Sequence, residues 1–145
     1  MARTLIIRTS ALGDIAMLVP IVASVASRYP QDRFTVMTRA AYIPLFANLG
    51  FNISVIGLDL KKKHSGILGF LRVLRKSLNY SHIADEHDVL RSKILRWSLI
   101  LFGKKVAHID KGREEKKNAI ESKELVPPLK TSTERYSEVF RKLGF

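Results

Sequence analysis

The stretch LIIRTSALGDIAMLVP, residues 5–20, decides the fold. Residues 5–7 are apolar, as in a buried strand, and the pattern from Ile15 onward is helical, with Gly13 permitting a tight turn between the two. In an open α/β sheet such a turn directs its side chains into the crevice beyond the carboxyl ends of the strands, where ligands bind. Asp14 is therefore expected at the position where such folds carry out chemistry.

The sequence alone is compatible with two roles for Asp14. Asp at a helix start commonly caps the first amide groups and complements the helix dipole. The same carboxylate could instead be a reacting group. The turn contains neither G-x-G-x-x-G nor G-x-x-x-x-G-K-[ST], so neither phosphate-binding motif applies to it.

The rest of the chain alternates between strand-like and helix-like segments. Further strands are predicted at residues 34–37, 53–56, 82–84 and 105–109. Helices are predicted at residues 14–28 (kinked or divided by Pro20), 40–48, 67–78, 89–102 and 131–143, the last with its cap at Ser132 or Thr133, while Val126-Pro127-Pro128 reads as a rigid extended segment. This alternation predicts a single α/β domain with a Rossmann-like parallel sheet flanked by helices.

Two of the predicted helices carry prominent apolar residues. Ile67, Phe70, Leu71, Leu74 and Leu78 have helical spacing and are expected in the core. The apolar residues around Trp97 are also expected in the core, because a parallel sheet needs both faces covered. A membrane-facing or partner-facing patch is the alternative for the Trp97 region.

The charge balance points to an anionic partner. The 145 residues contain 25 Lys and Arg against 13 Asp and Glu, a net charge of +12, which fits nucleic acid, phosphorylated glycans or anionic membranes. No cysteine is present, so disulfides and thiolate metal sites are excluded. The first strand begins almost at Met1 and the longest apolar stretch is far shorter than a membrane span, so we expect a cytoplasmic protein.

Charged residues gather after the predicted strands. Lys61, Lys62 and Lys63 follow the third strand, and a second basic run covers residues 111–117, so a positive rim is expected along one edge of the sheet, with a solvated charge run as the alternative. Asp85-Glu86-His87-Asp88 follows the fourth strand. Adjacent residues on one turn rarely converge on one ion, so we expect no metal site there and a helix cap at Asp88.

Several short motifs occur in an order that is similar to one enzyme family. They are Ser10-Ala11-Leu12-Gly13-Asp14, Lys61-Lys62-Lys63, Asp85 followed by Arg91-Ser92, Gly112-Arg113-Glu114, and Glu134-Arg135-Tyr136 leading to Leu143-Gly144. Together they resemble the heptosyltransferases of lipopolysaccharide core biosynthesis, in glycosyltransferase family 9. The resemblance covers nearly the whole chain.

The resemblance implies a GT-B glycosyltransferase with two Rossmann-like domains and an active site between them. Residues 1–145 would be the amino-terminal, acceptor-binding half, with the donor-binding carboxyl-terminal domain absent from this chain and the fragment alone inactive. The implied reaction is an inverting transfer of heptose from ADP-heptose to the lipopolysaccharide inner core, without metal or other cofactor. The implied partner is a lipid-linked acidic or phosphorylated glycan, with peripheral contact to the inner membrane.

The resemblance also implies roles for particular residues. Asp14 would be the catalytic base that takes the proton of the acceptor hydroxyl. The implied acceptor-binding residues are Ser10, Gly13, Lys61, Lys62, His87, Arg91 and Arg113. At the first basic position the family more often has arginine, whose two-pronged grip on an anion lysine cannot reproduce. The turn after the fourth strand departs from the family pattern too, with His87-Asp88 where a glycine usually precedes the helix.

Two other classes remain as alternatives. A basic nucleic-acid-binding module would explain the charge, but Phe34, Phe70, Trp97 and Phe140 lie in apolar patterns and do not interleave with basic residues as stacking platforms do. A single-domain nucleotide binder with flavodoxin-like strand order would explain the α/β pattern.

Overall fold

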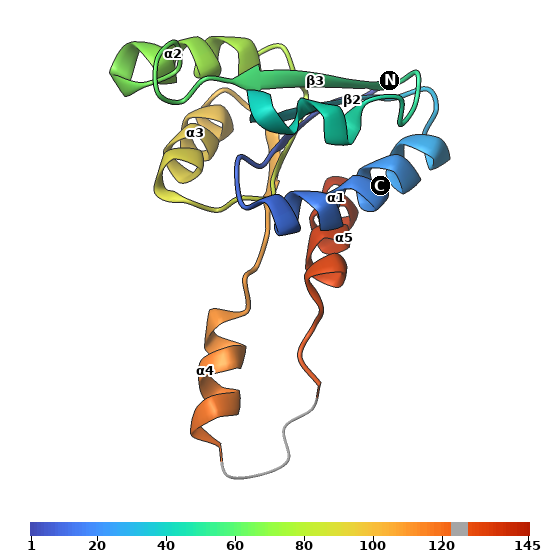
Figure 1. Ribbon diagram of the computed structural model, residues 1–145, viewed down its shortest axis with the longest axis vertical. Coiled ribbons are helices and arrows are strands. Elements are labelled where there is room, and N and C mark those ends of the chain that lie inside the picture. Colours follow the sequence, from blue (N-terminus) through green and yellow to red (C-terminus); the bar gives the residue numbers. More distant parts are fainter. Residues whose placement is uncertain (123–127) are drawn as a thin grey trace.

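The computed structural model describes residues 1–122 and 128–145, and these form one parallel sheet with helices on both faces (Figure 1). All neighbouring strands run parallel, in the order β3-β2-β1-β4-β5. The strands are β1 (Arg3–Ile7), β2 (Arg33–Arg39), β3 (Ile53–Leu58), β4 (His82–Asp85) and β5 (Lys105–His108). This confirms the predicted Rossmann-like α/β fold and excludes the flavodoxin-like order, in which β1 would lie between β2 and β3.

The helices divide between the two faces of the sheet. They are α1 (Leu12–Arg28), the short 3-10 helix η1 (Ala40–Phe46), α2 (Gly66–Ser77), α3 (Leu90–Leu101), α4 (Arg113–Glu121) and α5 (Ser132–Leu143). Helices α1 and α5 pack on the face that presents Ile6 and Val36, whereas α2 and α3 pack on the face that presents Leu5 and Met37. This division follows from the alternation of side chains along each strand.

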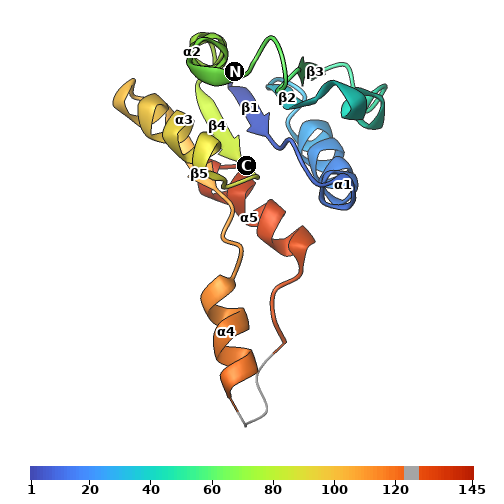
Figure 2. The ribbon, with the colours of Figure 1, turned by 60° about the vertical axis from the view of Figure 1, so that its left-hand side comes forward.

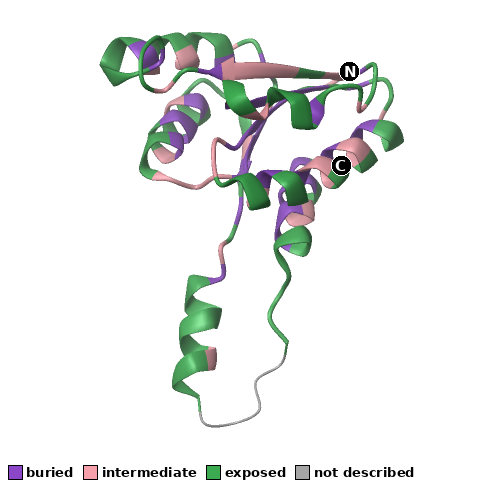
Figure 3. Ribbon diagram, viewed as in Figure 1, coloured by how far each residue is buried: buried purple, intermediate pink, exposed green. Residues whose placement is uncertain are grey.

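Helix α4 differs from the others because it extends away from the sheet. It contributes no buried residue, and Figure 3 shows it exposed along nearly its whole length. The chain passes into α4 from β5 and returns to the sheet through α5 (Figure 2). In the predicted extended segment, Val126 and Pro127 lie outside the described residues.

Several predicted helix starts are wrong by a few residues. Helix α1 begins at Leu12 with Ala11 at the cap position, so Asp14 lies in the first turn and not at the cap, and the helix continues through Pro20 without division. Residues 40–46 form a 3-10 helix where an α-helix was predicted. Val89, not Asp88, is at the cap position of α3.

Helix α5 is capped by Thr131 and not by Ser132 or Thr133. The Thr131 hydroxyl accepts a hydrogen bond from the amide of Glu134, whose carboxylate in turn accepts one from the Thr131 amide. This reciprocal pair satisfies two amide groups that a helix start leaves unpaired.

The expectation that Trp97, Ile67 and Leu71 lie in the core is wrong, since all three are exposed. Helix α3 is apolar on two faces, so its periodicity does not select the face that meets the sheet. The buried face carries Arg96, whose guanidinium donates to Asp85 at the end of β4 at 3.0 Å. This buried ion pair is made on the face opposite Trp97.

No helix among residues 1–122 and 128–145 combines the length and the hydropathy needed to cross a membrane.

Candidate functional site

Asp14 lies at the carboxyl end of β1, where two other side chains hold its carboxylate. Arg8, the first residue after β1, places Nη2 2.6 Å from Asp14 Oδ2. The Tyr136 hydroxyl, on α5, donates to Oδ1 at 3.2 Å. The Arg8 side chain is only 7% exposed, whereas that of Asp14 is 37% exposed. The carboxylate is therefore oriented from inside the protein while remaining accessible from outside.

The surroundings of Asp14 keep it ionised. Burial, the largest single influence, acts to raise the pKa of this carboxyl. The Arg8 charge and hydrogen bonds from Arg8, Tyr136 and the Ala11 backbone act to lower it, and together they outweigh burial, so the net pKa is below its ordinary value. Burial is the main cause that raises the pKa of Tyr136 to about 12. At neutral pH the site thus pairs a carboxylate with a protonated phenol.

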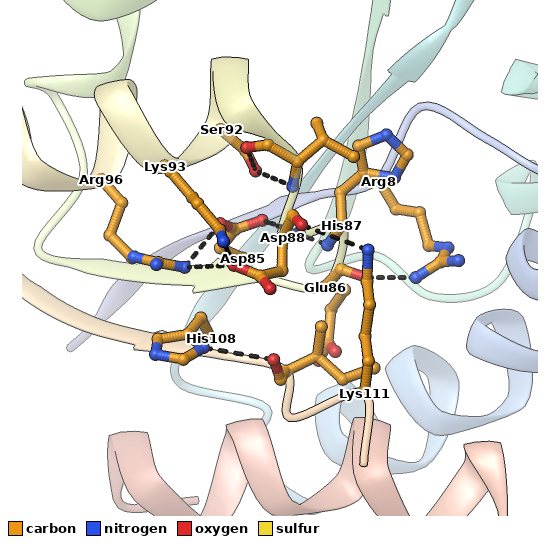
Figure 4. A network of polar contacts seen from close by, with 12 residues as sticks. Arg8, Asp85, Glu86, His87, Asp88, Ser92, Lys93, Arg96, His108 and Lys111 are labelled. Carbon is orange, nitrogen blue, oxygen red and sulfur yellow. Dashed lines mark hydrogen bonds and ion pairs between the residues drawn. The ribbon is translucent and has the colours of Figure 1, made fainter. Parts of the chain in front are cut away.

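Arg8 connects this site to the loop after β4, as Figure 4 shows. Its Nη1 donates to the backbone carbonyl of Glu86. The Glu86 side chain is fully buried, and neither of its carboxyl oxygens has a hydrogen-bond partner among the described residues. Burial raises the pKa of Glu86 well above its usual range, because the opposing influence of the Arg8 charge is smaller than the cost of burying a carboxylate.

The rest of the β4–α3 loop is fixed by a guanidinium bridge (Figure 4). Arg96 donates to Asp85 Oδ2 at 3.0 Å and to Asp88 Oδ1 at 3.2 Å, while the other Asp85 oxygen accepts from the amides of His87 and Asp88. Asp85 and Asp88 are thereby engaged in structural contacts. Within residues 1–122 and 128–145, no group of three or more His, Asp or Glu is placed to hold a metal ion.

A hollow of about 300 Å³ opens beside Asp14, and most of the charges around it are positive. We call it the Asp14 hollow; its lining includes Arg8, Asp14, Lys111, Lys116, Lys130, Arg135 and Tyr136. Lys130 is paired with Glu138, and Arg135 with Glu115. Lys111 and Lys116 have no carboxylate within ion-pair distance in the described part of the chain. These two ammonium groups are available to an anionic ligand.

Lys111 also lines a second hollow, of about 480 Å³, that contains Arg113. Its Nζ donates to the backbone carbonyl of Asp88, and burial is the main reason that its pKa is lowered. Gly112 lies between Lys111 and Arg113 in the sequence and has a φ of +59°. It packs directly against the Arg135 guanidinium, so a Cβ at this position would collide with that group. The left-handed backbone favours glycine here, and any side chain would also require the Arg135 guanidinium to move.

The remaining predicted residues lie in other parts of the same sheet edge. Ser10 is in the β1–α1 loop, whereas Gly13 is in the first turn of α1, next to Asp14. His87 and Arg91 line a narrow apolar crevice between α2 and α3, where burial is the main cause that lowers the pKa of His87. Lys61 and Lys62 are exposed in the loop after β3.

The predicted positive rim is therefore divided between opposite ends of the sheet edge. Lys61 follows β3 at one end and Arg113 follows β5 at the other, and these two strands are four strand spacings apart, roughly 19 Å. A small anion cannot contact both. An extended ligand could.

Sequence reasoning did not assign Arg8, Lys111, Glu86 or Tyr136 to the site. Arg8 immediately follows the apolar residues of β1, and this position at a strand end is the signal that could have identified it. Tyr136 belongs to the quoted Glu134-Arg135-Tyr136 motif, but the motif assigns no role to its hydroxyl. Its contact with Asp14 spans 122 residues, so no local pattern reveals it.

The position of the site in the sheet is that of ligand sites in related folds. The strand order changes direction between β1 and β4, and Asp14 follows the first of these strands while Glu86 and His87 follow the second. In open α/β sheets the crevice beyond such a switch point is where ligands bind.

Comparison of the structure with known proteins gives three informative matches. A glycosyl transferase family 9 structure from Veillonella parvula DSM 2008 has a TM-score of 0.69 and 19% identity, over 99% of this chain and 42% of the other. The chain shares its fold with part of this glycosyltransferase. E. coli heptosyltransferase WaaC with ADP matches with a TM-score of 0.63 and 21% identity. WaaC with ADP-2-deoxy-2-fluoro heptose matches with a TM-score of 0.62 and 18% identity.

The chain spans less than half the length of the glycosyltransferases that it matches. It covers 47% and 49% of the two WaaC chains, with 99% of its own residues in each alignment. No protein-family model matches the chain, and no curated protein matches it in sequence. The glycosyltransferase fold is thus shown by structure, at identities near 20%.

Proposed function

We propose that this chain is the amino-terminal, acceptor-binding domain of an inverting glycosyltransferase that transfers heptose from ADP-heptose to the lipopolysaccharide inner core. The observation that carries the proposal is the Asp14 carboxylate, held by Arg8 and Tyr136 and open to a hollow rich in cations. The shared fold with family 9 glycosyltransferases supports the same function.

In the proposed reaction Asp14 is the general base. An acceptor hydroxyl hydrogen-bonds to an Asp14 oxygen, and its own oxygen attacks the anomeric carbon of the donor from the side opposite the leaving group. The bond to the nucleoside diphosphate breaks as the new glycosidic bond forms, and the hydroxyl proton passes to the carboxylate. The lowered pKa of Asp14 keeps the carboxylate ionised and ready at neutral pH.

The cations would hold the acidic parts of the acceptor. Lys111 and Lys116 would bind phosphate or carboxylate groups in the Asp14 hollow, and Arg113 would bind them in the second hollow, in each case by charge-assisted hydrogen bonds. Ser10, Gly13, His87 and Arg91 remain proposed acceptor contacts. Lys61 and Lys62 would reach only a more distant part of an extended, lipid-linked glycan.

The donor would be bound mainly by a second domain that this chain does not contain. The proposed displacement needs a base and a leaving group but no metal or other cofactor. We place the reaction in the cytoplasm, at the surface of the inner membrane.

Ligand binding by this chain tests the acceptor assignment. Calorimetric titration is expected to detect a heptose-free inner-core lipopolysaccharide fragment and no ADP-heptose. Replacing Lys111 and Lys116 together with Met should weaken fragment binding at least about tenfold, since each charged hydrogen bond contributes roughly 1.5–3 kcal/mol. Exposed Arg141→Met and Arg28→Met form the matched control pair, because neither residue lines the Asp14 hollow or the second hollow. Unchanged binding by the lysine variant would remove the acceptor assignment.

Transfer itself is tested with a protein that joins this chain to the donor-binding domain. Asp14→Asn keeps the size of the side chain and removes the base, so the transfer rate should fall by about 10²–10⁴ while fragment binding persists. Near-normal turnover would refute the role of Asp14. A gel shift with random DNA and RNA over a salt series tests the nucleic-acid alternative, which tight binding with a steep salt dependence would favour.

A further inference from the structure

The outer face of α3 is apolar where a surface helix is normally polar. Leu90, Ile94, Trp97 and Leu101 follow one another at intervals of four, three and four residues, which places them on one side of the helix. They are between 52% and 88% exposed. The opposite side of α3 is buried against the sheet, so this helix presents apolar side chains in both directions.

The apolar surface continues from α3 onto the start of α2. One shallow groove is lined by Ile67 and Phe70 from α2 together with Leu90 and Ile94 from α3. A second groove, along α3, shares Leu90 and Ile94 and adds Trp97 and Leu101. We define the α2–α3 patch as Ile67, Leu68, Leu71, Leu90, Ile94, Trp97 and Leu101. Contiguous exposed apolar surfaces of this kind mark sites of interaction.

The charges around the patch are predominantly positive, with Lys93 paired to Asp88 at 3.8 Å. Helices α2 and α3 contain no Asp or Glu, whereas they carry Arg72, Arg75, Lys76, Arg91 and Lys93 in addition to the buried Arg96. The loop that leads into α2 adds Lys61, Lys62 and Lys63. A second copy of the chain placed symmetrically on the patch would bring these cations together, which is unfavourable.

We infer that the α2–α3 patch docks onto an anionic phospholipid bilayer. Apolar side chains with a Trp among them, surrounded by Lys and Arg, suit the boundary between acyl chains and negatively charged headgroups. The Trp97 ring and the Leu and Ile side chains enter the boundary, and the flanking Arg and Lys side chains bind the headgroups. The patch is on the side of the sheet that α2 and α3 cover, whereas α1 and α5, which carry Asp14 and Tyr136, pack on the other side. Binding of vesicles can therefore be tested separately from the transfer reaction.

Trp97 provides a direct measurement, because it is the only tryptophan in the chain. Phosphatidylcholine vesicles with and without phosphatidylglycerol are titrated into the protein while the emission of Trp97 is followed. The anionic vesicles are expected to shift the emission to the blue and to bind at least about tenfold more tightly than the neutral ones, and added salt should weaken the binding. Brominated acyl chains in the vesicles should quench the emission.

Variants that retain Trp97 locate the contact. Ile94→Gln with Leu101→Gln should weaken vesicle binding at least about tenfold, as measured by co-sedimentation and by Trp97 emission. Phe51→Gln is the matched control, because Phe51 is 86% exposed and lies outside the patch, and its binding should not change. Circular dichroism checks that each variant is folded.

Three results would overturn the inference. They are an unchanged Trp97 spectrum in anionic vesicles, equal vesicle binding by the Ile94/Leu101 variant, and a blue shift that grows with protein concentration in the absence of lipid. The last result would assign the patch to a second copy of the chain.

Discussion

Asp14 and Glu86 lie on either side of the same arginine, and their pKa values move in opposite directions. Each residue follows a central strand, β1 for Asp14 and β4 for Glu86, and each lies near the Arg8 guanidinium. Arg8 pairs directly with the Asp14 carboxylate but contacts Glu86 only at its backbone carbonyl. The comparison shows that proximity to a positive charge does not keep a carboxyl ionised when the carboxyl is fully buried and receives no hydrogen bond.

Removing the shared arginine should have the largest effect. Arg8→Met leaves the buried Glu86 carbonyl without its donor and frees the Asp14 carboxylate, so the free energy of unfolding should fall by about 2–4 kcal/mol. The pKa of Asp14 should rise, because burial is then no longer opposed by the Arg8 charge. Urea unfolding and carboxyl NMR titration measure both quantities. Arg28→Met, at the exposed end of α1, is the control, with an expected change within about 0.5 kcal/mol.

Replacing the buried carboxyl should change how stability depends on pH. Above about pH 4.5 Glu86 ionises in the unfolded chain but stays protonated in the folded one, so wild-type stability is lost as pH rises through this range. Glu86→Gln removes this loss. Its stability relative to wild type should increase by up to about 1.4 kcal/mol per pH unit until the folded pKa is reached. Thermal unfolding between pH 4 and 8 measures how the stability of each protein depends on pH. If the stability curves of Glu86→Gln and wild type run parallel, Glu86 ionises in the folded protein as it does in the unfolded chain.

The effect of the Asp14 ion pair on stability should be smaller and opposite in sign. The folded pKa of Asp14 is lowered, so its contribution is present above the unfolded value of about 3.8 and disappears as pH falls through the folded pKa. Because the side chain is 37% exposed, Asp14→Asn should cost less than about 1 kcal/mol at pH 7. Urea unfolding at pH 7 and pH 3 measures it. A larger loss at pH 3 than at pH 7 would contradict the assignment.

The hydroxyl of Tyr136 should have the smallest effect. Tyr136→Phe keeps the buried ring and removes one hydrogen bond to a partly exposed acceptor, so we expect a loss of about 0.5 kcal/mol. The pKa of Asp14 should rise less than it does in Arg8→Met, because the Arg8 charge ranks above the Tyr136 hydrogen bond among the causes that lower it. NMR titration of the two variants side by side gives the ranking.

Local sequence patterns were sufficient to predict the framework of this site. The apolar run of β1 and the helix that follows place Asp14 at the edge of a parallel sheet, as the structure has it, whereas the turn predicted at Gly13 is wrong because residues 8–11 make the connection and Gly13 lies inside α1. The alternation of later segments predicted all five strands of the sheet, because strand and helix periodicities are local properties.

The partners of Asp14 could not be predicted because they depend on packing between distant segments. Nothing in the sequence near Tyr136 indicates that its hydroxyl meets a residue from α1. Likewise, Glu86 stands in an acidic, polar run that is typical of exposed loops, and only the folded chain shows that it is buried. The orientation of α3 was missed for a similar reason, since a helix with two apolar faces gives no preference from periodicity alone.

The bridge from Arg96 to Asp85 and Asp88 has a mechanical consequence. It joins the middle of α3 to the end of β4 through buried contacts, so the helix cannot rotate about its axis without breaking them. The direction in which Trp97 points is therefore coupled to the direction in which the Asp14 hollow opens. A surface that captures α3 would fix the tilt of the whole sheet, and with it the direction in which the Asp14 hollow faces that surface.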